Sequence, residues 1–120
     1  MSEPTVLDAR TADAWEQWLE RNHDAVPEVW LRLLNKNASE AGISYGEAVE
    51  IALCFGWIDS LTRKYDAVSR IQRFTPRKPR SAWSKLNVER VQRLIDAGRM
   101  REAGLREVDS ARNDGRWSDR

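Results

Sequence analysis

The strongest constraint on the fold lies between Ile43 and Gly56, where the sequence predicts a helix with both ends specified. Ser44 and Glu47 form a capping box, in which each side chain bonds the backbone amide of the other residue. Gly56 follows the predicted helix at the position where a residue in the left-handed conformation, usually glycine, ends many helices. One apolar face recurs at helical spacing, formed by Ala48, Ile51, Ala52 and Phe55. We expect this face to pack against a strand predicted over Val29–Leu34.

Upstream of this helix the sequence predicts an extended lead-in, a helix and a strand. Val6 and Leu7 are available for pairing in the lead-in, and Thr11 can cap the helix that follows. The apolar stripe of that helix contains Trp15, Trp18 and Leu19. The strand over Val29–Leu34 is apolar on both faces, so we expect it to be central or covered by helices.

Downstream, Trp57–Tyr65 and Val68–Thr75 predict an antiparallel hairpin, which Pro76 ends because proline donates no ladder hydrogen bond. Ser84 can cap a further helix, and a last helix is predicted from about Arg101 to Asn113. The predicted fold is α+β, with a small antiparallel sheet of about three strands flanked by helices. We expect a single domain over residues 1–120, completed by a C-terminal helix hairpin over residues 84–114.

Composition narrows the functional classes. The chain has 120 residues, a formal net charge of +1, one cysteine and one histidine. These counts exclude an internal disulfide and argue against a dedicated zinc site, so no metal and no cofactor are expected. No apolar run is long enough for a membrane span, and the amino terminus lacks the features of a signal peptide. We therefore expect a cytoplasmic protein of bacterial type.

The most conspicuous connector runs from Arg73 to Lys85, between a predicted strand and a predicted helix. Its cationic side chains are interleaved with aromatic residues and prolines, which would stiffen the loop and hold the charges in place. Together with Asp59, the predicted ligand-binding residues are Arg73, Arg77, Lys78, Arg80, Ser81, Trp83, Ser84 and Lys85. The alternative is a solvated loop whose charges are paired internally. Trp83 is open to two interpretations, a stacking platform for a planar ligand or a plug that ties the loop down.

Two further residues have a chemical and a structural interpretation. Asp59 follows an apolar helix-to-strand junction, and we predict a sequestered carboxylate paired with Arg73 or Arg77 rather than a general acid or base. Cys54 is predicted to be a small buried hydrophobe, since the one histidine, His23, belongs to another element and is not placed to activate it.

Several motifs occur in an order typical of a known family: Glu28–Leu31, Ala52–Asp59, Arg73–Arg77 and Gly98–Met100. In these motifs the chain resembles the YdeI/OmpD-associated family, also labelled bacteriocin-protection proteins. The resemblance implies an α+β fold related to the YjbR/CyaY-like group, whose relatives include frataxin-like proteins and candidate DNA-binding proteins. The family name records a genetic association and no established reaction, so the resemblance implies no particular chemistry.

Three hypotheses of function follow. The leading one is a non-enzymatic module that binds an anionic ligand, such as a nucleotide, phosphate or nucleic acid, through the Arg73–Lys85 loop. The second is a protein-interaction or envelope-stress accessory module that docks an acidic protein partner. The third is a small enzyme that uses Asp59, which ranks last because no base, nucleophile and oxyanion set converges in the sequence.

Overall fold

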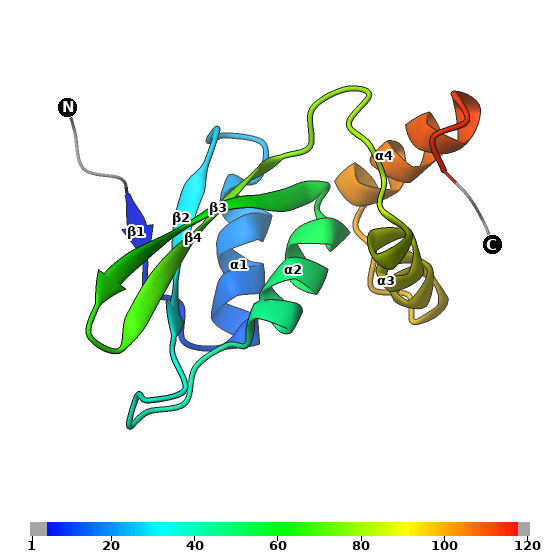
Figure 1. Ribbon diagram of the computed structural model, residues 1–120. Helices are drawn as coiled ribbons and strands as arrows, with labels where there is room; N and C mark the ends of the chain where they lie inside the picture. Colours follow the sequence, from blue (N-terminus) through cyan, green and yellow to red (C-terminus); the bar gives the residue numbers. More distant parts are fainter. Residues whose placement is uncertain (1–4, 118–120) are drawn as a thin grey trace.

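The computed structural model describes residues 5–117, and a four-stranded sheet forms its centre (Figure 1). In spatial order, the strands are β1 (Val6–Leu7), β2 (Val29–Leu34), β4 (Ser69–Pro76) and β3 (Trp57–Asp66). β1 is parallel to β2, and the other neighbouring strands are antiparallel. The α+β prediction is confirmed. The sheet has four strands instead of about three, because the short lead-in pairs with Trp30 and Leu31.

The helices are α1 (Ala12–Asn22), α2 (Tyr45–Cys54), α3 (Lys85–Asp96) and α4 (Glu102–Asn113). Helices α1 and α2 lie together on one face of the sheet, and β3 and β4 pass in front of them in Figure 1. Helices α3 and α4 lie beyond one end of the sheet, where both contact α2. The predicted caps Thr11, Ser44 and Ser84 each accept a hydrogen bond from an amide of the first turn. Among residues 5–117, no helix covers the face of the sheet opposite α1 and α2, which is called the open face below.

Helix α2 is the most buried of the four helices, as its predicted apolar face requires. Residues Ala48, Ile51, Ala52 and Phe55 are all buried. Its main neighbours are α1, α3, α4 and β3, whereas the sequence suggested packing on β2. The reason is connectivity, because α2 runs through Gly56 directly into β3 and is held over that edge strand. Trp15 of α1 instead packs on the sheet, with its ring 5.1 Å from that of Phe74.

Helix α4 approaches the end of α2 very closely. A Cβ atom placed on Gly104 would lie 2.3 Å from the carbonyl oxygen of Cys54. The amide of Arg101 donates a 3.0 Å hydrogen bond to the same oxygen. Glycine at position 104 is therefore what lets α4 sit against the core.

Candidate functional site

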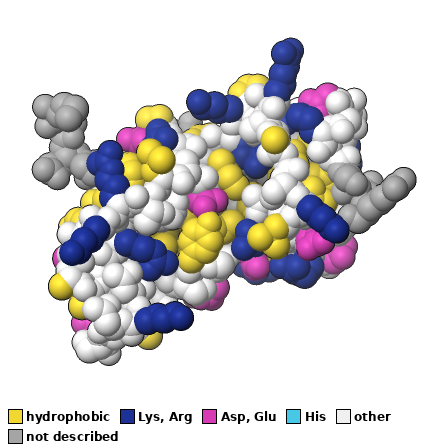
Figure 2. Space-filling view, in the orientation of Figure 1, with side chains coloured by type: hydrophobic (Ala, Val, Ile, Leu, Met, Phe, Trp, Pro, Cys, Tyr) yellow, Lys and Arg dark blue, Asp and Glu magenta, His cyan; other side chains and the backbone are white. Residues whose placement is uncertain are grey.

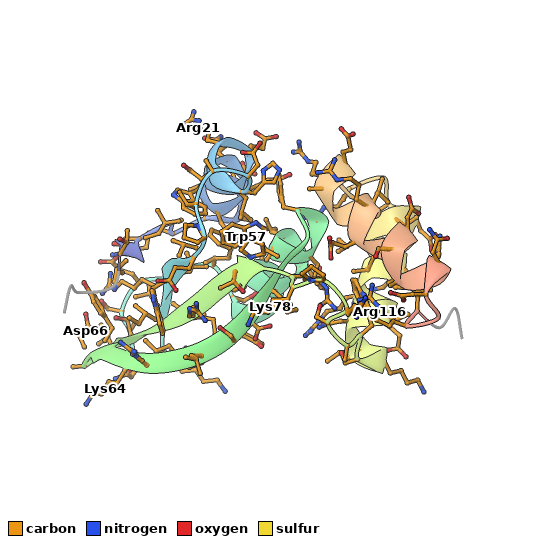
Figure 3. The ribbon with its side chains drawn as sticks, turned by 90° about the horizontal axis from the view of Figure 1, so that it is seen from above. Arg21, Trp57, Lys64, Asp66, Lys78 and Arg116 are labelled. Atoms are coloured by element: carbon orange, nitrogen blue, oxygen red, sulfur yellow. The ribbon has the colours of Figure 1, made fainter. Side chains whose placement is uncertain are left out.

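The loop of residues 77–84 leaves β4, crosses the end of the sheet near α4 and enters α3 (Figure 3). Arg77 fixes its start. The Arg77 amide donates to the carbonyl of Gly56, and Nη2 of its side chain donates to the carbonyls of Ala82 at 2.9 Å and Ser81 at 3.3 Å. The residue is only 7% exposed, so it braces the loop from inside and does not project into solvent.

Trp83 connects this brace to the end of the chain. The guanidinium carbon of Arg77 lies 3.8 Å from the centre of the Trp83 ring. The same ring meets Trp117 edge to face, with centroids 5.0 Å apart. Arg116 donates to the carbonyl of Ser81 at 2.8 Å and also pairs with Asp114. These contacts favour the plug interpretation of Trp83, because Arg77 and Trp117 occupy positions that a stacked base would need.

The buried guanidinium of Arg77 has an unusual electrostatic environment. Desolvation lowers its pKa, with Arg116 acting in the same direction and Glu107 in the opposite one. Within residues 5–117 it forms no ion pair, and its Nε is a buried donor without a protein partner, as are Trp83 Nε1 and the Ser81 hydroxyl. Arg77 is thus held by backbone carbonyls and an aromatic ring, and it is not exposed as a ligand contact.

Two other cations of the loop, and a third at the start of α3, face outward. Lys78, Arg80 and Lys85 are all exposed. Arg80 has φ = +65°, a left-handed conformation that is uncommon for a residue with a Cβ atom. Arg116, and more weakly Arg80, lowers the pKa of Asp114. A 3.1 Å hydrogen bond from the Ser81 amide to the Lys78 carbonyl closes the turn that carries Arg80.

The predicted pairing of Asp59 with Arg73 or Arg77 is wrong. Asp59 lies opposite Phe74 on the helix-covered side of the sheet, where it accepts a hydrogen bond from the Tyr45 hydroxyl. Arg73, the next residue along β4, points to the open face and pairs there with Glu28 at 2.6 Å. Alternation of side chains along the strand therefore separates the two predicted partners.

Ser84 and Cys54 have structural roles. The Ser84 hydroxyl accepts from the Asn87 amide at 3.1 Å, so the predicted ligand contact is instead a helix cap. Burial, reinforced by Glu16 and Glu50, raises the pKa of the Cys54 thiol to about 11, against the opposing effect of arginines. His23 bonds the carbonyl of Leu19 through Nδ1. Cys54 is the small buried hydrophobe that the sequence predicted.

The electrostatic feature that sequence reasoning missed is charge segregation. Residues 60–88 contain eight lysines and arginines and one aspartate, although the net charge of the whole chain is +1. Of these eight cations only Arg73 forms an ion pair with residues 5–117. Leaving out Arg73 and the buried Arg77, we call the other six the basic surface: Arg63, Lys64, Arg70, Lys78, Arg80 and Lys85. Lys and Arg side chains are spread over the face shown in Figure 2. Counting charges in windows along the sequence would have placed the hairpin cations in the predicted site together with those of the loop.

A hollow of about 530 Å³ has a different character. It lies between the end of α1 and the start of α4, over Phe55. Charged and polar side chains of both signs line it: Glu20, His23, Asp24, Arg101, Glu102 and Arg106. Arg101 is already paired with Glu16 and Glu20. With three carboxylates against two arginines in its lining, this hollow does not favour an anion.

The part of the chain that the structure describes contains neither a candidate metal site nor a candidate membrane-spanning helix. Over residues 5–117 no group of three or more His, Cys, Asp or Glu side chains is placed to hold a metal ion. Over the same residues no helix has the length and apolar character needed to cross a bilayer.

With the geometry established, a family model matches residues 7–107. The chain belongs to the family described as Domain of unknown function (DUF8412). The match includes all of the basic surface and ends before Arg116 and Trp117, which brace the loop. No curated protein and no solved structure matches the chain. The resemblance to the YdeI/OmpD-associated family stays a prediction.

Proposed function

We propose that this DUF8412 domain is a non-enzymatic module that binds nucleic acid through its phosphate backbone. The observation that carries the proposal is the segregation of eight cations and one acid into residues 60–88. Because those cations lie on one hairpin and the loop that follows it, positive charge is concentrated in one part of the molecule, whereas the rest of the chain has 12 lysines and arginines against 18 acidic residues. Such a concentration of charge is the electrostatic footprint expected of a protein that neutralises phosphates.

The shape of the surface favours an extended polyanion over a single nucleotide. The cations run from the β3–β4 turn to the start of α3, and β4 alone spans about 25 Å at the usual rise per strand residue. A nucleotide would need a pocket with a stacking partner, and Trp83 is already covered by Arg77. The α3 amide that would bind a single phosphate is capped by Ser84.

Rigidity of the loop supports binding. Arg77 and Arg116 fix its carbonyls from both sides, and the two prolines Pro76 and Pro79 limit the backbone. Lys78 and Arg80 therefore project from a backbone that is already ordered. Less conformational entropy is lost on binding from such a loop than from a flexible one.

The test is fluorescence anisotropy with a labelled oligonucleotide, measured over a series of salt concentrations. Charge reversal at Lys78 and Lys85 together should weaken binding and reduce the slope of log K against log salt, by about 0.7–0.9 for each phosphate that the variant no longer neutralises. The matched control is Arg21→Glu, an exposed cation in the last turn of α1, which lies away from both the hairpin and the 77–84 loop (Figure 3). This control should bind like the parent.

Absence of measurable binding to single-stranded or duplex nucleic acid at low salt would overturn the proposal. An equal weakening of binding in the Lys78/Lys85 variant and in Arg21→Glu would also overturn it, because the basic surface would then have no special part in binding.

The second candidate function is docking of an acidic protein partner, as in an envelope-stress or bacteriocin-protection accessory role. It is favoured by two exposed apolar side chains beside the cations, Leu61 at 55% and Tyr65 at 50% exposure. Polyglutamate binding as tightly as an oligonucleotide of equal charge would favour this candidate over the first.

A further inference from the structure

Resting on the proposed function, we propose that the basic surface is selective for single-stranded nucleic acid, with one base stacked on Tyr65 of the open face. Three features support this inference: how Tyr65 is held, which charges adjoin it, and how poorly a duplex fits this face.

Tyr65 is an exposed ring supported from one side. The guanidinium carbon of Arg32 lies 5.8 Å from the centre of the Tyr65 ring, and half of the residue remains exposed. Arg32 is itself fixed by three contacts, to the Ser69 hydroxyl at 3.0 Å, to Asp66 at 3.2 Å and to Asp8 at 3.3 Å. The ring is therefore positioned by a rigid cation on one side, while its exposed surface remains open to a ligand.

The neighbouring side chains extend this platform. Arg63 lies two residues from Tyr65 on β3, and its guanidinium carbon is 4.7 Å from the centre of the buried Trp30 ring. Arg63 is exposed and unpaired with any acid in residues 5–117, so it can contact a phosphate or stack beside a base. Leu61, two residues further along the same strand, adds exposed apolar surface. Aromatic rings interleaved with cations are the usual surface for single strands.

A duplex fits the same face poorly. The major groove admits a helix or a two-stranded ribbon. The β3–β4 hairpin is not a free ribbon, because β2 pairs with β4 along its length from Ser69 to Phe74. Tyr65 also cannot stack on the bases of a duplex while they remain stacked on one another, whereas the bases of a single strand expose their faces.

The experiment compares binding of oligothymidylate and of a duplex of the same length by the parent and by three variants. Tyr65→Leu should reduce affinity for oligothymidylate by about fivefold to a hundredfold and change little for the duplex. Tyr65→Phe, which keeps the ring, should bind oligothymidylate like the parent. Tyr45→Leu removes the other tyrosine, which is 39% exposed on α2, and should leave both affinities unchanged.

The outcomes separate this inference from the proposed function. If both nucleic acids bind with the expected salt dependence and Tyr65→Leu behaves like the parent, stacking on Tyr65 is wrong and phosphate binding stands. A preference of the parent for the duplex would likewise overturn single-strand selectivity alone. If neither nucleic acid binds, both proposals fail. Thermal unfolding of each variant establishes that the domain is folded wherever affinity falls.

Discussion

Substitution of Gly104 by alanine offers the sharpest test of how α4 is joined to the core. The added Cβ atom would lie 2.3 Å from the Cys54 carbonyl oxygen and 2.8 Å from two further backbone atoms of Leu53 and Cys54. Ordinary contacts begin near 3.4 Å, so the two helices must separate by roughly 1 Å. The atoms involved belong to the backbone, which cannot turn aside as a flexible side chain would.

The magnitude follows from three contributions. Overpacking costs about 1–3 kcal/mol, and weakening the hydrogen bond from the Arg101 amide to Cys54 adds about 1 kcal/mol. The better helix propensity of alanine returns up to about 1 kcal/mol. Separation would also loosen the packing of Val108 and Ala111, which are buried residues of α4. We therefore expect a net destabilisation of about 1–4 kcal/mol, which lowers the melting temperature by roughly 5–15 °C.

The assay is thermal and urea unfolding followed by circular dichroism, with Gly46→Ala as the matched control. Gly46 is also helical, in α2, but nothing lies within 4 Å of the position of its Cβ atom. That variant should gain about 0.4–1 kcal/mol, because alanine restricts the unfolded chain. A Gly104→Ala protein as stable as the parent would refute the close approach of α4 to α2.

Two further predictions concern Tyr45 and Asp59. Asp59→Asn keeps an oxygen that can accept a hydrogen bond from the Tyr45 hydroxyl. Chemical denaturation should therefore show that the variant is destabilised by less than about 1.5 kcal/mol. A destabilisation of about 3 kcal/mol or more would instead indicate that Asp59 belongs to a buried ion pair. Burial first, then the hydrogen bond to Asp59, raises the pKa of Tyr45 to about 12 from 10.0. The stability linked to this shift is therefore complete below about pH 10 and is lost as the pH rises towards 12. Phenolate absorbance should show a titration step near pH 12 that Tyr45→Phe removes. The absence of such a step from the parent would contradict the shift.

The elements that could be predicted from the sequence depend on local chemistry. Three predictions rest on residues that are near one another in the sequence: the cap at Ser44, the cap at Ser84 and the hairpin around Asp66. All three are confirmed. The Asp66 side chain itself stabilises the turn, accepting from the Val68 amide at 3.0 Å and from the Ser69 hydroxyl. Local patterns of this kind do not depend on how the rest of the chain packs.

What could not be predicted depends on contacts between distant parts of the chain. The sequence marks Asp59 and Arg73 as chemically suited partners, but the register of β3 on β4 puts them on opposite faces of the sheet. The sequence indicates that Val6 and Leu7 are available for pairing, but not that β2 offers them its free edge. Of the candidate site, the exposed cations Lys78 and Arg80 could be identified from composition. The burial of Arg77 depends on Trp83 and on the end of the chain, so a local pattern does not encode it.

The bracing of the loop by Arg116 and Trp117 couples two segments that are more than 30 residues apart. The amides of both residues bond the carbonyl of Ala111, so the last turn of α4 holds them in place. If that turn opens, Trp83 and the Ser81 carbonyl are deprived of these partners at the same time. Amide hydrogen exchange in the 77–84 loop should therefore follow that of the end of α4, and the two segments should behave as one cooperative unit. The order of the loop cations Lys78 and Arg80 is then limited by the stability of the last turn of α4.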